Sequence, residues 1–78
     1  MHYVYLLRSE MTDNKYIGTT IYLKRRLNEH NSGKSTYTNK FKPWRIEMYI
    51  AFTDKEKANK FETYLKSGSG RAFTERHL

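Results

Sequence analysis

Arg26, His30 and Glu62 are the side chains whose type and position in this sequence suggest chemistry. Arg26 and His30 are one helical turn apart, and at about 100° per residue both fall along the edge of a stripe formed by Leu23 and Leu27. A cation and an imidazole are therefore expected where a helix meets a sheet. A simpler interpretation also stands for these two residues seen alone, a solvated surface charge and a residue at a helix end, because charges are common on helix faces.

Glu62 is the unusual residue of a second expected helix, whose buried stripe is Ala58, Phe61 and Leu65. In helical projection Glu62 lies about 40° from Ala58, inside or beside that stripe. Desolvating a carboxylate there is costly unless a cation, a metal ion or hydrogen-bond donors receive it. An ion pair with Lys66, one turn later, is the simpler alternative. The angular position of Glu62 favours a further partner for its carboxylate, in addition to Lys66.

The strands expected around these residues follow from the hydrophobic pattern. Residues 3–8 are apolar on both faces, which is typical of a central strand. Residues 15–19 return as the second strand of a hairpin, and Gly18 within them suggests a close approach of backbone or ligand. Alternating polar and apolar residues over 45–52 predict a third, half-buried strand that begins after Pro43.

The first helix is expected to begin after the bend at residues 19–20 and to end near Gly33. Thr20 is the predicted N-cap, because a hydroxyl just before an amphipathic run can accept from a free backbone amide. Gly33 is a natural helix stop. A flexible basic loop is predicted over residues 34–42.

The second helix is expected to begin at Thr53, which with Glu56 forms the pattern of a capping box. The glycine-rich residues 67–70 should end it. Residues 71–78 are then predicted to form a short basic terminal helix. The fold class is therefore α+β (α/β in the broad sense), with the order strand, strand, helix, strand, helix, helix.

Composition limits the class of protein. With 78 residues the chain is expected to be one domain, residues 1–78, with a small core. It has no cysteine and three scattered histidines, so any bound metal is expected to have oxygen ligands. No apolar run approaches the roughly 20 residues that cross a bilayer, and no leader pattern begins the chain, so a soluble cytoplasmic protein without membrane contact is expected.

The charge balance favours a polyanionic partner. Lys and Arg total 15 against 8 acidic residues, a formal net charge of +7, and such an excess suits nucleic acid better than acidic lipid or an acidic protein. Tyrosines among basic residues suit base stacking, although the strand propensity of tyrosine explains part of their number. The residues predicted to contact nucleic acid are Lys15, Arg25, Lys34, Tyr37, Lys40, Lys42 and Arg71.

At this point the sequence resembles the GIY-YIG nuclease family over almost its whole length. The resemblance rests on the triplets Tyr3-Val4-Tyr5 and Tyr16-Ile17-Gly18, followed at the family's spacings by Arg26 and His30. Glu62, on the second expected helix, matches the family's single catalytic carboxylate. The stretch from Ala58 to Arg71 looks especially like small stand-alone bacterial members. No single piece is specific, but the ordered set is.

The resemblance implies a three-stranded antiparallel sheet flanked by helices and metal-dependent hydrolysis of phosphodiester bonds in DNA. Glu62 would ligate one Mg²⁺ or Mn²⁺ ion, and Arg26 would hold the scissile phosphate. Tyr5, assisted by His30, would orient or deprotonate the attacking water, and Tyr16 would complete the network. Which of Tyr5, Tyr16 and His30 takes the proton is left open.

The sequence departs from the family pattern in two places. Tyr3 replaces a glycine that is structural in the family. Some members carry an asparagine after the glutamate, and here no asparagine follows Asn59, so that role is vacant or filled by a group such as His77. Without an obvious recognition domain, specificity would come from residues 32–42, from DNA or RNA shape, or from a protein partner.

Two other functions are compatible with the same sequence. The chain could be a non-catalytic nucleic-acid-binding module that retains the nuclease fold, or a basic scaffold for protein interactions. A carboxylate kept in an apolar stripe argues against the scaffold. DNA is the expected partner, with RNA as the second candidate.

Overall fold

Strand β1 (His2–Ser9) is the middle strand of a three-stranded antiparallel sheet, with β2 (Lys15–Thr20) and β3 (Trp44–Phe52) as its edges, in the order β2-β1-β3. The computed structural model describes all residues, 1–78. The pairing of β1 with β3 contains a register shift between Leu6 and Leu7. The predictions of a central first strand and of an α+β fold are confirmed.

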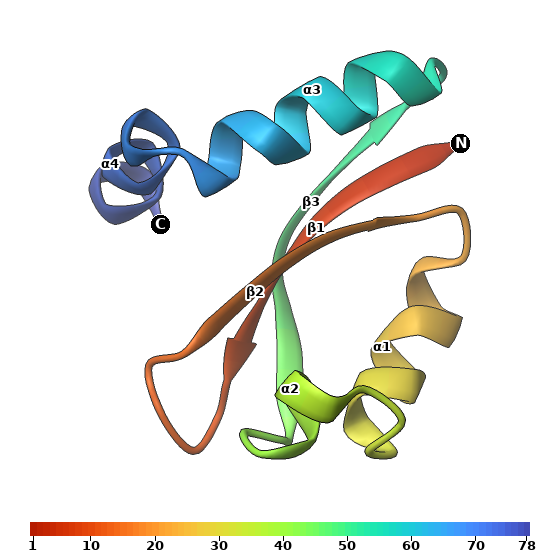
Figure 1. The fold of residues 1–78 in the computed structure, drawn as a ribbon, viewed down its shortest axis with the longest axis vertical. Coiled ribbons are helices and arrows are strands. Elements are labelled where there is room, and N and C mark those ends of the chain that lie inside the picture. The colour runs from red at the N-terminus through yellow and green to blue at the C-terminus, as the bar shows by residue number, and fades with distance from the viewer.

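Helices cover both faces of this sheet (Figure 1). Helix α1 (Leu23–Asn31) and the single turn α2 (Thr36–Asn39) lie on one face, whereas α3 (Lys55–Lys66) lies on the other. Helix α4 (Gly68–His77) follows α3 and packs against it. None of these helices combines the length and apolarity that a membrane crossing requires.

Each face of the sheet has its own apolar cluster, because successive side chains of β1 point to opposite faces. Val4 packs with Ala58 and Leu65 under α3, as the predicted stripe requires. Tyr5 packs with Leu7 and Trp44 on the other face, and these are joined there by Tyr16, Leu23, Leu27, Phe41 and Ile46. Tyr5 is thus both a core residue and a candidate site residue.

The prediction of a flexible loop over residues 34–42 is wrong, because this segment contains α2 and is anchored to the sheet. Thr38 is fully buried, and its carbonyl oxygen accepts a hydrogen bond of 2.7 Å from the indole of Trp44. The ring of Tyr37 packs against Phe41 and Trp44. Aromatic contacts hold the short helix in place where its own length could not.

Both predicted N-caps are also wrong. The N-cap of α1 is Tyr22, which makes no side-chain cap bond, and the hydroxyl of Thr20 instead accepts from the Tyr22 amide at 3.0 Å. The N-cap of α3 is Asp54, not Thr53, and its carboxylate accepts from the Glu56 amide at 2.9 Å. An aspartate caps at least as well as a threonine, so the helix begins one residue later.

The end of α3 and the start of α4 share one tight junction. Helix α3 ends where the glycine-rich residues 67–70 begin, as predicted, but α4 already begins at Gly68 rather than at residue 71. The hydroxyl of Ser67 caps α4 by accepting from the Gly70 amide at 3.2 Å. A Cβ at Gly70 would collide with the carbonyl oxygen of Tyr64, so only glycine allows this approach.

Candidate functional site

Tyr5 projects from the middle of β1 and lies over Gly18, its neighbour on β2. A Cβ placed on Gly18 would come within 2.7 Å of the Tyr5 hydroxyl oxygen and 2.9 Å of the ring carbon that carries it. Real side chains do not approach that closely, so the phenol can occupy this position only because residue 18 is glycine. The sequence predicted that backbone or a ligand would approach Gly18 closely; the group that does so is instead the side chain of Tyr5.

A buried hydrogen-bonded chain extends from Tyr5 through His30 to Thr38. The Tyr5 hydroxyl oxygen is 3.0 Å from Nε2 of His30, and Nδ1 of His30 is 2.8 Å from the hydroxyl oxygen of Thr38. All three side chains are at most 1% exposed. A neutral imidazole donates through one ring nitrogen and accepts through the other, so both nitrogens of His30 are satisfied within this chain. His30 is therefore more than a residue at a helix end.

Burial changes the acidity of both groups. It lowers the pKa of His30 to about 4, and the positive charge of Arg26 contributes in the same direction. Burial also raises the pKa of Tyr5 to about 12, helped by Tyr16 and opposed by Arg26. At neutral pH the imidazole is thus uncharged and the phenol is protonated.

Arg26 lies on the edge of α1, with its side chain 34% exposed. Its Nη1 donates to Oε1 of Glu29 at 2.9 Å, one turn later, and this bond raises the pKa of Arg26 and lowers that of Glu29. The positive charge of Arg26 lowers the pKa of Tyr5. The guanidinium is thus held by Glu29 beside the phenol, with part of its surface free for an anion.

Glu62 extends from α3, on the opposite side of the sheet from α1. Its carboxylate is 22% exposed and accepts from Nζ of Lys66 at 2.9 Å. The simpler alternative considered from the sequence, this ion pair, is therefore present. The charge of Glu62 nevertheless raises the pKa of Tyr5, although as the smallest of the contributions. The pKa of Tyr5 thus responds to Arg26 and, more weakly, to Glu62, which lie on helices on different faces of the sheet.

The oxygen ligands available to a metal ion are few. No group of three or more His, Asp or Glu side chains converges anywhere in the structure. Both ring nitrogens of His30 are occupied by hydrogen bonds. A single partly exposed carboxylate, Glu62, suits a hard ion such as Mg²⁺ that keeps most of its waters, and does not suit a tightly caged metal.

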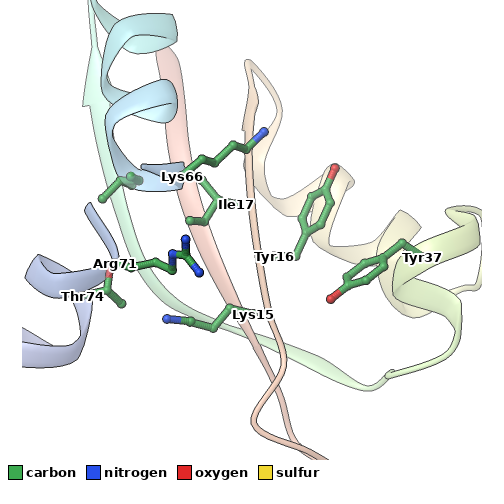
Figure 2. Close-up of a pocket in the computed structure, with 8 residues that line it drawn as sticks. Lys15, Tyr16, Ile17, Tyr37, Lys66, Arg71 and Thr74 are labelled. Carbon is green, nitrogen blue, oxygen red and sulfur yellow. The ribbon is translucent and has the colours of Figure 1, made fainter. Parts of the chain in front are cut away.

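A cavity of about 440 Å³ lies beside this site, between β2, α2 and the junction of α3 with α4 (Figure 2). Three of the residues predicted to contact nucleic acid, Lys15, Tyr37 and Arg71, meet there. The ring of Tyr16, which also lines the cavity, has its centroid 4.6 Å from that of His30. The complete lining is Lys15, Tyr16, Ile17, Tyr37, Leu65, Lys66, Arg71 and Thr74.

The other predicted nucleic-acid contacts are more dispersed. Arg25 and Lys34 line a hollow along the outer side of α1, where Arg25 also lies 5.7 Å from the centre of the Tyr22 ring. Lys40 and Lys42 are exposed after α2. His77 packs against Phe73 and lines a separate hollow on α4, so its proposed substitution for an asparagine gains no geometric support.

Two residues with clear roles in this geometry were not identified from the sequence. Glu29 orients Arg26, and its three-residue spacing from Arg26 was a usable signal. Thr38 orients His30, but it belongs to a different element and no local pattern links the two.

Comparisons with known proteins show the family to which this chain belongs. A family model described as the GIY-YIG catalytic domain matches residues 1–76. UPF0213 protein BH0048 of Halalkalibacterium halodurans is 40% identical over 72 residues, which cover 90% of this chain and 74% of that protein. The solution NMR structure of UPF0213 protein BH0048 from Bacillus halodurans covers 96% of this chain and 82% of its own, with a TM-score of 0.57 and 33% identity. This chain belongs to the GIY-YIG family, whose members are nucleases.

Proposed function

We propose that this protein is a metal-dependent endonuclease that hydrolyses phosphodiester bonds in DNA. The observation that carries the proposal is the position of Tyr5, which is hydrogen-bonded to a buried neutral His30 and is influenced by both Arg26 and Glu62. A hydrogen-bonded phenol and imidazole, a cation and a carboxylate are the kinds of group that catalyse phosphoryl transfer to water.

Arg26 is the group proposed to bind the scissile phosphate. Its planar guanidinium can donate two parallel hydrogen bonds to phosphate oxygens. Negative charge builds on those oxygens as the water attacks, so the bonds strengthen in the transition state. The pair with Glu29 fixes the guanidinium before the substrate arrives. This preorganisation is what a flexible surface arginine would lack.

Tyr5 and His30 are proposed to share the proton of the attacking water. With a pKa near 12, Tyr5 is not a phenolate at neutral pH and cannot act as a base alone. If its hydroxyl proton passes to Nε2 of His30 as the phenol oxygen accepts the proton from water, no separate phenolate forms. Tyr16, whose ring contacts that of His30, would help to orient the water.

Glu62 is the residue proposed to hold one Mg²⁺ or Mn²⁺ ion. When bound, such an ion stabilises charge on the phosphate and the leaving oxygen. The Glu62 carboxylate must first exchange its bond with Lys66, and an exposed pair of this spacing is worth only about 0.3–0.5 kcal/mol. The ion pair is therefore a weak competitor for the metal.

DNA is the proposed substrate because the nucleases of this family act on DNA and the net charge of +7 suits a polyanion. RNA is the second candidate, and a protein partner could supply specificity. A cytoplasmic location stays a prediction.

The proposal is tested by incubating the protein with single-stranded, duplex and branched DNA in Mg²⁺, in Mn²⁺ and in EDTA. Cleavage should require the metal and should be lost in Glu62→Ala and Arg26→Ala. Glu75→Ala and Arg76→Ala, which remove the same charges from exposed positions on α4, should cleave like wild type. Equal cleavage by all five proteins would indicate a contaminating nuclease and remove the support.

A second function, nucleic-acid binding without turnover, is favoured by one observation. Glu62 is occupied by Lys66, and the phenol of Tyr5 is held protonated, so neither group is primed for reaction. Binding that weakens steeply with salt, with no cleavage under any metal, would identify this function.

A further inference from the structure

The cavity beside the site combines positive charge with an aromatic and apolar lining. Lys15 of β2 and Arg71 of α4 extend toward the same space, with Lys66 above them (Figure 2). Ile17 and Leu65 supply apolar surface, and no acidic residue lines the cavity. This combination suits a ligand that has both an anionic group and a flat apolar group.

Tyr37 provides an aromatic surface at the mouth of the cavity. Tyr37 is 46% exposed, and its ring contacts the rings of Phe41 and Trp44, whose centroids are 5.4 Å and 6.5 Å away. Tyr16 lies 6.2 Å from it, tilted by 33°. A partly exposed ring that is held by neighbouring rings can stack on a base at little entropic cost.

We propose that this cavity binds one unpaired nucleotide of the DNA strand that is cleaved, an inference that rests on the proposed function. The base would stack on Tyr37, and the phosphate would lie between Lys15 and Arg71. A volume of about 440 Å³ is within the range of small-ligand sites. A base inside a duplex has both faces covered by its neighbours, so only an unstacked base can reach the ring.

The location of the cavity connects this nucleotide to the scissile phosphate. Tyr16 belongs both to the cavity lining and to the cluster of rings around His30. Arg26 itself lines a separate hollow, with Thr20, Tyr22, Arg25 and Glu29, so we place the nucleotide in the cavity on the Tyr16 side of the scissile phosphate. The cavity selects a strand whose bases are unpaired beside the cut, and Tyr37, Lys15 and Arg71 become specificity residues.

The inference is tested by equilibrium binding, measured by fluorescence anisotropy in EDTA so that nothing is cleaved. The probes are a short thymidine strand and an abasic strand of the same length and charge. Tyr37→Ala should weaken binding of the thymidine strand about tenfold, because one stacked base is lost, and should leave the abasic strand unaffected. Tyr37→Phe, which keeps the ring, should bind both strands like wild type.

The phosphate part of the site is tested on another element. Arg71→Gln should weaken binding of both strands and reduce the slope of log affinity against log salt by about 0.7, the value for one phosphate contact on a single strand. Lys57→Gln removes one charge from an exposed position of α3 outside the cavity and is the matched control. The Arg71 variant keeps the test decisive if Tyr37→Ala fails to fold.

Equal loss of thymidine and abasic binding in Tyr37→Ala, or an Arg71→Gln that behaves like Lys57→Gln, would overturn the inference. Failure of the nuclease proposal looks different: base-dependent binding through Tyr37 would persist while no metal supports cleavage. Metal-dependent cleavage with no effect of Tyr37 or Arg71 would leave the nuclease proposal standing and remove the nucleotide site.

Discussion

His30 is neutral because it is completely buried, and this makes the free energy of unfolding depend on pH. Its pKa is about 4 in the folded chain and 6.5 when unperturbed. Between these pH values the unfolded chain binds a proton at His30 that the folded chain does not. The contribution of His30 to the free energy of unfolding is therefore fully present above pH 6.5 and falls as the pH drops toward 4. We expect urea denaturation to show a loss approaching about 3 kcal/mol over this window.

The matched variant for this prediction is His30→Gln, which has no titratable group at the position. Its stability should be lower at pH 7 and should change less between pH 7 and pH 4 than that of the wild type. An identical pH dependence in the two proteins would show that another group is responsible.

Gly18→Ala should lower the rate of DNA cleavage, because it displaces the side chain of Tyr5. The added methyl would meet the Tyr5 hydroxyl at 2.7 Å, so the phenol must move away from His30. A displacement of about 1 Å at a reacting group costs on the order of a hundredfold in rate. We expect the rate of DNA cleavage by Gly18→Ala to fall by about this factor. The control is Gly68→Ala, where the added Cβ meets nothing within 4 Å. Wild-type cleavage by Gly18→Ala would contradict the role of Tyr5.

At the scale of residues, the sequence predicted the site in those places where the pattern is local. The turn of helix between Arg26 and His30, and the angle of Glu62 in its stripe, were both readable from spacing. The partner of His30 was not, because Thr38 belongs to another element and reaches His30 only after folding. The spacing of Glu62 and Lys66 indicated their ion pair, but the angular position of Glu62 favoured another partner. The structure contains the ion pair, because one lysine is enough to satisfy a partly exposed carboxylate.

At the scale of elements, the junction between α3 and α4 depends on Gly70. Gly70→Ala would drive a methyl into the carbonyl of Tyr64 and the backbone of Leu65, so the two helices must separate. We expect a loss of about 1–3 kcal/mol in the free energy of unfolding, as for other overpacked sites. Gly68→Ala, two residues earlier and in open space, should be neutral or slightly stabilising.

Thermal unfolding of the two alanine variants checks this prediction, and equal melting temperatures would contradict it. The rate of DNA cleavage is a second readout, and it should fall in Gly70→Ala. Arg71 lies one residue after Gly70, so the loosened junction should also displace the wall of the cavity to which Arg71 belongs.

Helices and strands were predictable where the hydrophobic period repeats several times along the sequence. They were less predictable where one or two residues decide the position or the boundary of the element. The central strand and the stripe of α3 are long patterns and were found. Helix α2 has only four residues and is held by contacts of Tyr37 with distant rings, so no local pattern announces it. The start of α4 was predicted too late because glycines usually end helices, whereas here Gly70 lies inside α4 and permits its close contact with α3.

At the scale of the whole molecule, the site is built across the edge of the sheet. Arg26 comes from a helix on one face and Glu62 from a helix on the other (Figure 1). Arg26 lowers the pKa of Tyr5 and Glu62 raises it slightly, and the buried phenol of Tyr5 lies over Gly18 of the edge strand β2. The central claim is that these two charges act on one phosphate.

That claim is tested most directly by a double-mutant cycle on the Mg²⁺-dependent rate of DNA cleavage. Arg26→Ala and Glu62→Ala should each lower the rate by about a hundredfold or more. Groups that act as a unit are not additive, so the double variant should be little slower than either single variant. Losses that multiply, as for two independent sites, would contradict a shared phosphate, and so would a variant of either residue that cleaves like wild type.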